Sequence, residues 1–381
     1  MWLSSSELLW GSMQLMVTDQ TRRRLLQAAF WGVALPLPTT FGCASVNADK
    51  KPALIGCAIS GRDRYQVVIA DHRGQPIAVH PLPKRGHGVA VQPNGTQAVA
   101  FARRPGDYFQ PFDYESGEMK PLVVPEADRH FYGHGVYSKD GEYLFVTEGD
   151  KTTSRGIIGV YQVSNGYKKI DEWSGFGIGP HEVILLENNQ LAIGVGGVHT
   201  LGRTPQNLES MMPSLSYLNM AGELVDQVGL PDHQLSIRHL ATDANGAVYC
   251  GQQYRGEPDN YPSLVAVHSG LSSGGKGKSG LKMLNAEPEE WARFNHYIAS
   301  IAVHENTLIA TSPRGNCYGI WDLASNKLLE LSALPDASGA VASEDGFWLS
   351  SGAAKVVHQA YDQPRQTLSS NIYWDNHWSV I

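Results

Sequence analysis

Short apolar runs alternate with polar turns along most of this chain, and the alternation repeats. Four segments share one pattern, a histidine followed by a short apolar run and an Asn-Gly, Asp-Gly or Asn-Asn turn: residues 87–95, 134–141, 181–189 and 239–246. A second apolar run follows each turn, at residues 97–102, 143–147, 190–195 and 248–251. Turns of this kind supply the positive φ angles that a tight hairpin requires, so each segment predicts a pair of antiparallel strands.

The same unit recurs in weaker form and extends to four strands. Residues 300–306 and 339–346 repeat the strand and turn without the histidine. Third apolar elements that end in turns lie at residues 68–74, 112–117, 160–166, 216–222 and 320–326. Four short strands per unit of about 40–60 residues are typical of β-propeller blades. Two units are lengthened by insertions, at residues 198–213 and 270–278.

Six inner strands are therefore predicted, beginning near residues 87, 134, 181, 239, 300 and 339. The seventh is predicted at residues 377–381, which would pair with residues 53–59, so that both ends of the chain build one blade. We predict an all-β, seven-bladed β-propeller of the WD/YVTN-like type over residues 52–381. The alternative, a two-domain α/β fold, needs helical periodicity, and little is present beyond residues 287–294.

The N-terminal segment predicts export. Residues 21–27, Thr-Arg-Arg-Arg-Leu-Leu-Gln, precede an apolar run at 28–37 and predict a twin-arginine signal within residues 1–48. We therefore expect a periplasmic protein, with Met13 or Met16 as a candidate start. The alternatives are an ordinary secretory signal and a lipid anchor at Cys43, which would be the protein's attachment to the membrane. The net charge of −7, without a basic stripe, argues against nucleic-acid binding.

The candidate chemistry lies in the histidines. Five of the 14 fall at the first position of a predicted inner strand: His87, His134, His181, His239 and His377. Because inner strands surround the axis of a propeller, these imidazoles should converge at one mouth of the central channel. Imidazole-rich sites suit late first-row transition metals, and we expect iron or copper, with zinc a weaker alternative. The residues predicted to contact the imidazoles or to line the mouth are Arg85, Tyr132, Glu182, Arg238 and Asp375, with Gln252 and Gln253.

A structural role for these histidines stays open. Propellers of the WD-repeat type carry Gly-His dipeptides before the inner strand, where the histidine is a hydrogen-bond partner, and His87 and His134 each follow a glycine. His181, His239 and His377 follow Pro, Arg and Asn instead, yet they keep the same register. The sequence contains no Walker motif, nucleophile elbow, CxxC pair or haem-attachment motif.

Several motifs together resemble a known family. They are Arg-Gly-His-Gly at 85–88, Tyr-Gly-His-Gly at 132–135, Gly-Pro-His-Glu at 179–182, Leu-Glu-Ser-Met-Met-Pro-Ser-Leu at 208–215, Ser-Ile-Arg-His-Leu at 236–240 and Trp-Asp-Asn-His-Trp at 374–378. In this order they resemble the exported bacterial proteins grouped as domain-of-unknown-function family 1513. The resemblance implies a periplasmic propeller that is often encoded near iron-uptake and imelysin-type proteins, so its partners would be periplasmic proteins of a metal-uptake system. It supplies no established activity.

Three functional hypotheses follow. The first is a periplasmic metal-binding protein that handles iron or copper through the channel histidines. The second is a metal-dependent oxidoreductase or lyase that uses the same ring with an open metal position. The third is a protein-interaction platform in which the histidines are structural.

Overall fold

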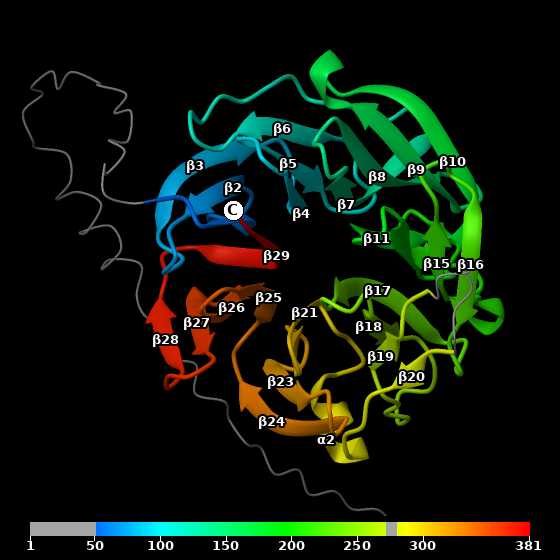
Figure 1. The fold of residues 1–381 in the computed structure, drawn as a ribbon, viewed down its shortest axis with the longest axis vertical. Coiled ribbons are helices and arrows are strands. Elements are labelled where there is room, and N and C mark those ends of the chain that lie inside the picture. Colours follow the sequence, from blue (N-terminus) through cyan, green and yellow to red (C-terminus); the bar gives the residue numbers. More distant parts are fainter. Residues whose placement is uncertain (1–50, 272–279) are drawn as a thin grey trace, which may run out of the picture. The chain divides into compact units, whose positions relative to one another are not determined.

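Seven sheets make up most of the part of the chain that the structure describes. The computed structural model describes residues 51–271 and 280–381, and the predicted export signal, with Cys43, lies outside them. Within these residues the sheets are arranged around a common axis (Figure 1), six with four strands and one with three, and a two-stranded hairpin is added to one of them. The predicted seven-bladed β-propeller is therefore confirmed.

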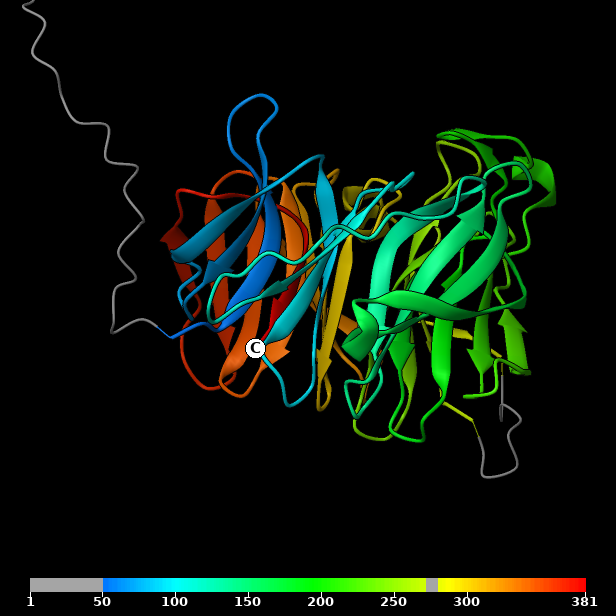
Figure 2. The ribbon, with the colours of Figure 1, turned by 90° about the horizontal axis from the view of Figure 1, so that it is seen from above.

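The inner strands form a closed ring around the axis. They are β29 (Tyr373–Val380), β4 (Gly86–Val91), β7 (Arg129–Tyr137), β11 (Pro180–Leu185), β17 (Leu235–Thr242), β21 (Ser300–His304) and β25 (Ala337–Ser343). Each contacts the next in this order, and β25 contacts β29, so the ring has no gap. Figure 2 shows the same sheets from the side, with their strands running between the two faces of the ring.

Three further sets of strands build the blades outward. The second strands are β1 (Leu54–Ile59), β5 (Gln97–Ala102), β8 (Tyr143–Asp150), β12 (Leu191–Val195), β18 (Val248–Tyr254), β22 (Thr307–Ser312) and β26 (Gly346–Ser351). The third strands are β2 (Tyr65–Ala70), β6 (Phe109–Asp113), β9 (Arg155–Gln162), β15 (Ser214–Leu218), β19 (Val265–His268), β23 (Cys317–Asp322) and β27 (Lys355–Ala360). The outer strands are β3 (Pro76–Leu82), β10 (Lys168–Ile178), β16 (Leu224–Gly229), β20 (Lys282–Met283), β24 (Lys327–Ala333) and β28 (Gln366–Ser369).

Few residues lie outside the blades. The insertion between β12 and β15 holds the hairpin β13 (Thr200–Leu201) and β14 (Thr204–Pro205), and the helix α2 (Pro288–Arg293) lies between β20 and β21. Short 3₁₀ turns span Val163–Asn165 and Leu208–Ser210. No helix among the described residues combines the length and the hydropathy needed to cross a bilayer.

The two ends of the described chain meet in one sheet. β29 pairs antiparallel with β1, for example Leu54 with Val380 and Gly56 with Trp378, and the strand order is β29-β1-β2-β3. Glycine is required at position 56 because a Cβ there would lie 2.5 Å from Cδ1 of Trp378. This blade thus takes one strand from the C-terminal region and three from the N-terminal region.

Apolar side chains fill the spaces between neighbouring sheets. Phe101 of β5 packs with Phe131 and Leu144 of the next sheet, and Tyr217 of β15 packs with Ile237 of β17. The second strands are buried on both faces, which explains why they read as continuous apolar runs instead of alternating patterns. Removal of this surface from water is the main stabilising contribution to the fold.

One predicted strand is missing. The sheet β4-β5-β6 has no regular fourth strand, and isolated bridges join Phe109 to Val123 and Phe112 to Met119 instead. Pro121 lies between the two bridging residues, and proline has no N–H to donate to a ladder. The segment therefore makes scattered backbone hydrogen bonds to β6, such as Lys120 N–H to the Pro111 carbonyl, without forming a regular strand.

Candidate metal centre

The backbone turns the five histidines toward the axis by breaking the regular strand pairing. In each case the inner strand has a register shift against its second strand at the histidine. The paired residues that flank the shifts are Gly86 and Val89, Phe131 and Gly135, Pro180 and Val183, Ile237 and His239, and Trp374 and Trp378. Irregularities of this kind redirect side chains and are over-represented next to functional sites. β21, whose one histidine is His304 at its far end, pairs with β22 without a shift, whereas β25, which has no histidine, is also shifted, between Ala337 and Ala340.

The predicted position of the histidines within their strands needs a correction. His87 and His181 are the second residues of β4 and β11, but His134, His239 and His377 are preceded by four or five residues of their own strands. In these three strands, residues before the irregularity also pair with the second strand, as Phe131 does with Glu148. The three strands therefore begin earlier than the sequence pattern indicates. The imidazoles consequently lie inside the channel and not at its mouth.

The structure brings all five predicted histidines together in a closed ring. Neighbouring ring centroids are 4.8 Å (His87–His134), 4.7 Å (His134–His181), 4.9 Å (His181–His239), 4.5 Å (His239–His377) and 4.6 Å (His377–His87) apart. All five residues are buried. Residues separated by as many as 290 positions, such as His87 and His377, thus become neighbours because the chain closes on itself.

Two overlapping triplets could hold a metal ion. His87, His134 and His377 form one, and His134, His181 and His239 form the other; within each, one ligand nitrogen per residue lies within 4.8 Å of the others. Nitrogens bonded at about 2.0–2.1 Å to one tetrahedral ion are about 3.3–3.4 Å apart, so the imidazoles of either triplet would move closer together on binding. His134 belongs to both triplets and is the central ligand candidate.

Each of the five imidazoles has at least one buried nitrogen that makes no hydrogen bond with a described residue. Six buried nitrogens of the ring have no hydrogen-bond partner in the described part of the chain: His87 Nδ1, His134 Nε2, His181 Nδ1, His239 Nδ1 and Nε2, and His377 Nε2. Buried polar atoms are almost always paired in native proteins, so each of these atoms requires an explanation. The structural hydrogen bonds expected of Gly-His dipeptides are not made by these nitrogens.

The ring is poised in its neutral form. Burial, followed by the neighbouring imidazoles, lowers the pKa values of His87 and His181 well below the usual range. Burial and then Arg238 lower the pKa of His239 to about 3. Neutral imidazole, with a free lone pair, is the form that binds metals.

The predicted surrounding residues divide into two groups. Glu182 contacts the ring: its Oε2 lies 3.3 Å from His239 Nδ1 and its Oε1 lies 3.8 Å from His134 Nδ1, while Oε2 also accepts the Leu240 N–H at 2.9 Å. Burial raises the pKa of this carboxyl. A carboxylate beside metal-binding imidazoles orients the rings and increases their basicity.

The other predicted residues lie on one side of the ring. Asp375 accepts a 2.5 Å hydrogen bond from Arg85 Nε and not from an imidazole, and Arg238 is buried there. Tyr132 is fully buried, with the Arg104 guanidinium 5.8 Å from its ring centroid. Gln253 lines the cavity on this side, whereas Tyr132 and Gln252 are not among its lining residues.

Two cavities meet the ring, one on each side. The first, of about 410 Å³, is lined by residues that follow the histidines, such as Gly88 and Gly135, together with His134, His377 and Glu182. The second, of about 430 Å³, is lined by residues that precede the histidines or end the second strands, together with His87 and His181. The imidazoles therefore form a partition across the channel that both cavities reach.

Sequence reasoning missed most of the side chains of the second cavity. They are Arg103, Arg104, Arg203, Arg255, Tyr297, Pro313, Arg314, Asp336 and Asn376. A signal was present, because β5, β18 and β22 are each followed by arginine within two residues. Second strands run antiparallel to inner strands, so their ends meet at the mouth where the inner strands begin.

Fold and site define a class: a seven-bladed β-propeller with a histidine ring that can hold a metal across its channel. The chain belongs to the family described as protein of unknown function (DUF1513), whose sequence profile matches residues 80–381. No curated protein matches the sequence. Among solved structures, hydrazine synthase of Kuenenia stuttgartiensis is similar, with a TM-score of 0.58, 13% identity, and coverage of 89% of this chain and 100% of that chain. At this identity the likeness concerns the fold alone.

Proposed function

We propose that this protein is a periplasmic metal-binding propeller that handles iron or copper through the ring His87, His134, His181, His239 and His377. The observation that carries the proposal is the set of six buried imidazole nitrogens without a hydrogen bond in one ring, of which only His239 Nδ1 has a carboxylate, that of Glu182, beside it. A bound cation would use the lone pairs that the protein leaves free. All-nitrogen donors with one adjacent carboxylate favour a late first-row transition ion over magnesium or calcium.

Metal analysis of the purified protein tests the proposal. The protein is dialysed against Cu(II), Fe(II) anaerobically, or Zn(II), and bound metal is counted by elemental analysis; about one ion per chain is expected. X-ray absorption should report nitrogen ligands at about 2.0–2.1 Å. The His134→Ala/His181→Ala variant should lose the ion, because it disables both triplets.

A matched control separates the ring from incidental surface binding. His72 is an exposed histidine on the turn after β2, and His72→Ala should bind as much metal as the wild type. Metal content below about 0.1 per chain with all three ions, or equal loss in both variants, contradicts the proposal.

Export is part of the same proposal and is tested separately. The motif at residues 21–27 supports transport of a folded protein to the periplasm, where proteins of a metal-uptake system would be its partners. Replacement of Arg22, Arg23 and Arg24 by lysine should retain the full-length chain in the cytoplasmic fraction. An unchanged periplasmic yield of the variant excludes the twin-arginine route.

Access to the ring favours a second candidate, a metal-dependent oxidoreductase. Cavities of about 410 and 430 Å³ reach the imidazoles from both sides, so a substrate and an electron donor would each have a path to the ion. A redox change of the loaded metal on addition of a reductant, followed by reoxidation on addition of substrate, would favour the enzyme over a carrier. A metal that keeps one oxidation state throughout favours the carrier.

A further inference from the structure

The second cavity has an unusual concentration of positive charge for a protein whose net charge is −7. Seven arginines line it: Arg85, Arg103, Arg104, Arg203, Arg238, Arg255 and Arg314. A single carboxylate, Asp336, lies among the lining residues, and Asp375 behind them is paired with Arg85. The cavity therefore carries a large excess of guanidinium groups over acidic partners.

The fold gathers these arginines from distant parts of the chain. Arg103 and Arg104 follow β5, Arg255 follows β18, and Arg314 follows β22. Arg203 comes from the turn of the β13–β14 hairpin, where its Nη2 donates to the Arg104 carbonyl at 2.8 Å. The inserted hairpin thus reaches across the channel mouth and adds its own charge to the cavity.

Two of these arginines have a buried Nε without a hydrogen-bond partner among the described residues. Arg238 is only 5% exposed, and its Nε makes no hydrogen bond with any described residue; Arg255 Nε is likewise without one. Burial, followed by Arg314 and Arg104, lowers the pKa of Arg255 to about 10. Burial of an unpaired guanidinium near others costs stability, and an anion placed between them would relieve this cost.

We infer that this arginine-lined cavity binds a small polyanion that carries two or more carboxylate or phosphate groups. The planar fork of each guanidinium pairs with the oxygens of either group in two parallel hydrogen bonds. A volume of about 430 Å³ suits a small organic or inorganic anion. His87 and His181 also line the cavity, so the bound anion would lie beside the metal of the proposed function, but anion binding itself does not depend on that metal.

Calorimetric titration of the metal-free full-length protein tests the inference, with citrate and pyrophosphate as probes and acetate as a monovalent comparison. One polyanion per chain should bind, and the affinity should fall as NaCl is raised, because salt screens the charges. Binding of citrate alone identifies carboxylates as the natural ligand chemistry, binding of pyrophosphate alone identifies phosphates, and binding of both indicates recognition by charge. Absence of binding by both polyanions, or binding no tighter than that of acetate, overturns the inference.

Variants locate the site. Arg238→Met/Arg255→Met should weaken polyanion binding by about tenfold or more while thermal stability is unchanged or higher, because a buried unpaired charge is removed. Arg203→Met, on an exposed turn, should weaken it less and carries little risk to folding. The control Arg73→Met/Arg155→Met replaces two exposed arginines outside the cavity and should bind normally. Equal loss in the control overturns the inference.

A third variant separates this inference from the metal proposal. His134 and His377 line the opposite cavity, so His134→Ala/His377→Ala should abolish metal binding and retain polyanion binding. If the wild-type protein binds metal but does not bind polyanions, the anion cavity is refuted and the metal centre is not. Polyanion binding without any metal uptake would refute the metal centre alone.

Discussion

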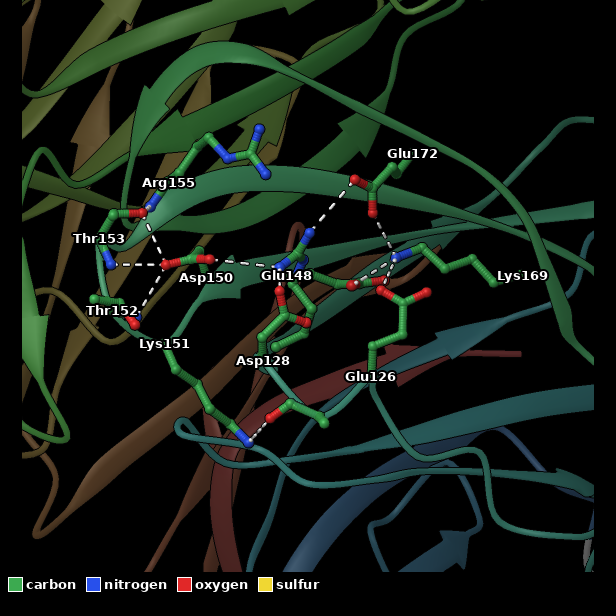
Figure 3. Close-up of polar contacts among 12 residues, drawn as sticks. Glu126, Asp128, Glu148, Asp150, Lys151, Thr152, Thr153, Arg155, Lys169 and Glu172 are labelled. Atoms are coloured by element: carbon green, nitrogen blue, oxygen red, sulfur yellow. Dashed lines mark hydrogen bonds and ion pairs between the residues drawn. The ribbon is translucent and has the colours of Figure 1, made fainter.

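Two regions of the propeller bury charged and polar side chains, and they treat them in opposite ways. On the sheet β7–β10, Lys169 Nζ lies 3.1 Å from Glu148 Oε2 and 3.0 Å from Glu172 Oε2, and Arg129 Nη2 lies 3.5 Å from Glu172 Oε1 (Figure 3). The buried Glu148 also accepts a 2.6 Å hydrogen bond from the Tyr161 hydroxyl. Each buried charge in this network meets an opposite charge within the protein.

In the channel, buried charged and polar groups are mostly left without such partners. The imidazoles are left with unpartnered nitrogens, and the arginines outnumber the carboxylates among the described residues that line the second cavity. In the network of β7–β10 each charge has an opposite charge beside it, although Arg129 Nε makes no hydrogen bond with a described residue. The channel lacks this compensation of charge, which indicates partners that the chain does not contain. The contrast therefore separates structural polar groups from binding groups in one molecule.

The two blades without a channel histidine show the same difference between satisfied and unsatisfied polar groups among the inner strands. Ser300 Oγ accepts the Ala340 N–H at 3.0 Å, and the Gly339 N–H donates to Ser350 Oγ at 2.8 Å. At the corresponding place of β21 a serine satisfies a neighbouring backbone N–H, and at that of β25 the glycine N–H is satisfied by a serine of β26. The five other inner strands use the same places for imidazoles.

The largest expected effect comes from breaking the paired network. Lys169→Met leaves Glu148 buried without its cation, and the free energy of unfolding should fall by about 3 kcal/mol at pH 7.5, as measured by urea denaturation. The deficit should shrink toward pH 5, because the folded protein binds a proton at Glu148, whose pKa burial already raises, more readily than the unfolded chain does. Lys168→Met, at the exposed neighbouring position, should change stability by less than about 0.5 kcal/mol. Equal effects of the two substitutions would remove the distinction between the network and ordinary surface.

Supplying the missing partner of the channel should have the next largest effect. Copper or iron at about 100 times its dissociation constant should raise the free energy of unfolding of the wild type by about 2.7 kcal/mol. His134→Ala should abolish this gain, because His134 belongs to both triplets, whereas His72→Ala should keep it. Stabilisation of all three proteins by the same amount would place the metal outside the ring.

Lowering the pH should reveal the effect on stability of a buried histidine that lies outside the ring. Burial, and then Arg104, lower the pKa of His130 to about 4. Between pH 6.5 and 5 the histidine therefore becomes protonated in the unfolded chain and stays neutral in the folded protein. His130 therefore contributes about 1.5 kcal/mol to the loss of stability over this range. Denaturation of metal-free protein at both pH values should show a loss that is smaller by this amount in His130→Gln. His72→Gln should behave as the wild type, and an identical loss in His130→Gln would show that His130 takes up its proton in the folded state.

The smallest effect on the free energy of unfolding is expected from replacing an imidazole that makes no hydrogen bond through its buried nitrogen. In metal-free protein, His181→Leu removes an imidazole whose Nδ1 has no partner within the described residues, so the free energy of unfolding should change by less than about 1 kcal/mol. The same substitution should lower metal uptake. A loss of about 3 kcal/mol or more in denaturant titrations of the metal-free variant would show that the ring is a structural element.

The sequence predicted the architecture because a propeller is a local repeat. Strand, turn and strand recur at regular intervals, so the number of blades followed from the spacing of segments such as 134–141 and 239–246. The register also placed five histidines on inner strands, and circular geometry was enough to predict their convergence. The missing fourth strand beside Pro121 was foreseeable in the same local way, since proline removes a ladder donor.

By itself the sequence determined which residues face the axis: the period of strands and turns assigns each residue to a blade and a strand. Only the tertiary structure decided how deep the imidazoles lie, which of their nitrogens are left without partners, and that arginines such as Arg104, Arg238 and Arg314 share one cavity. These features depend on register shifts at single residues and on the distance between side chains of different blades. Both are fixed only when all seven sheets close around the axis, because no local interaction between neighbouring residues sets them.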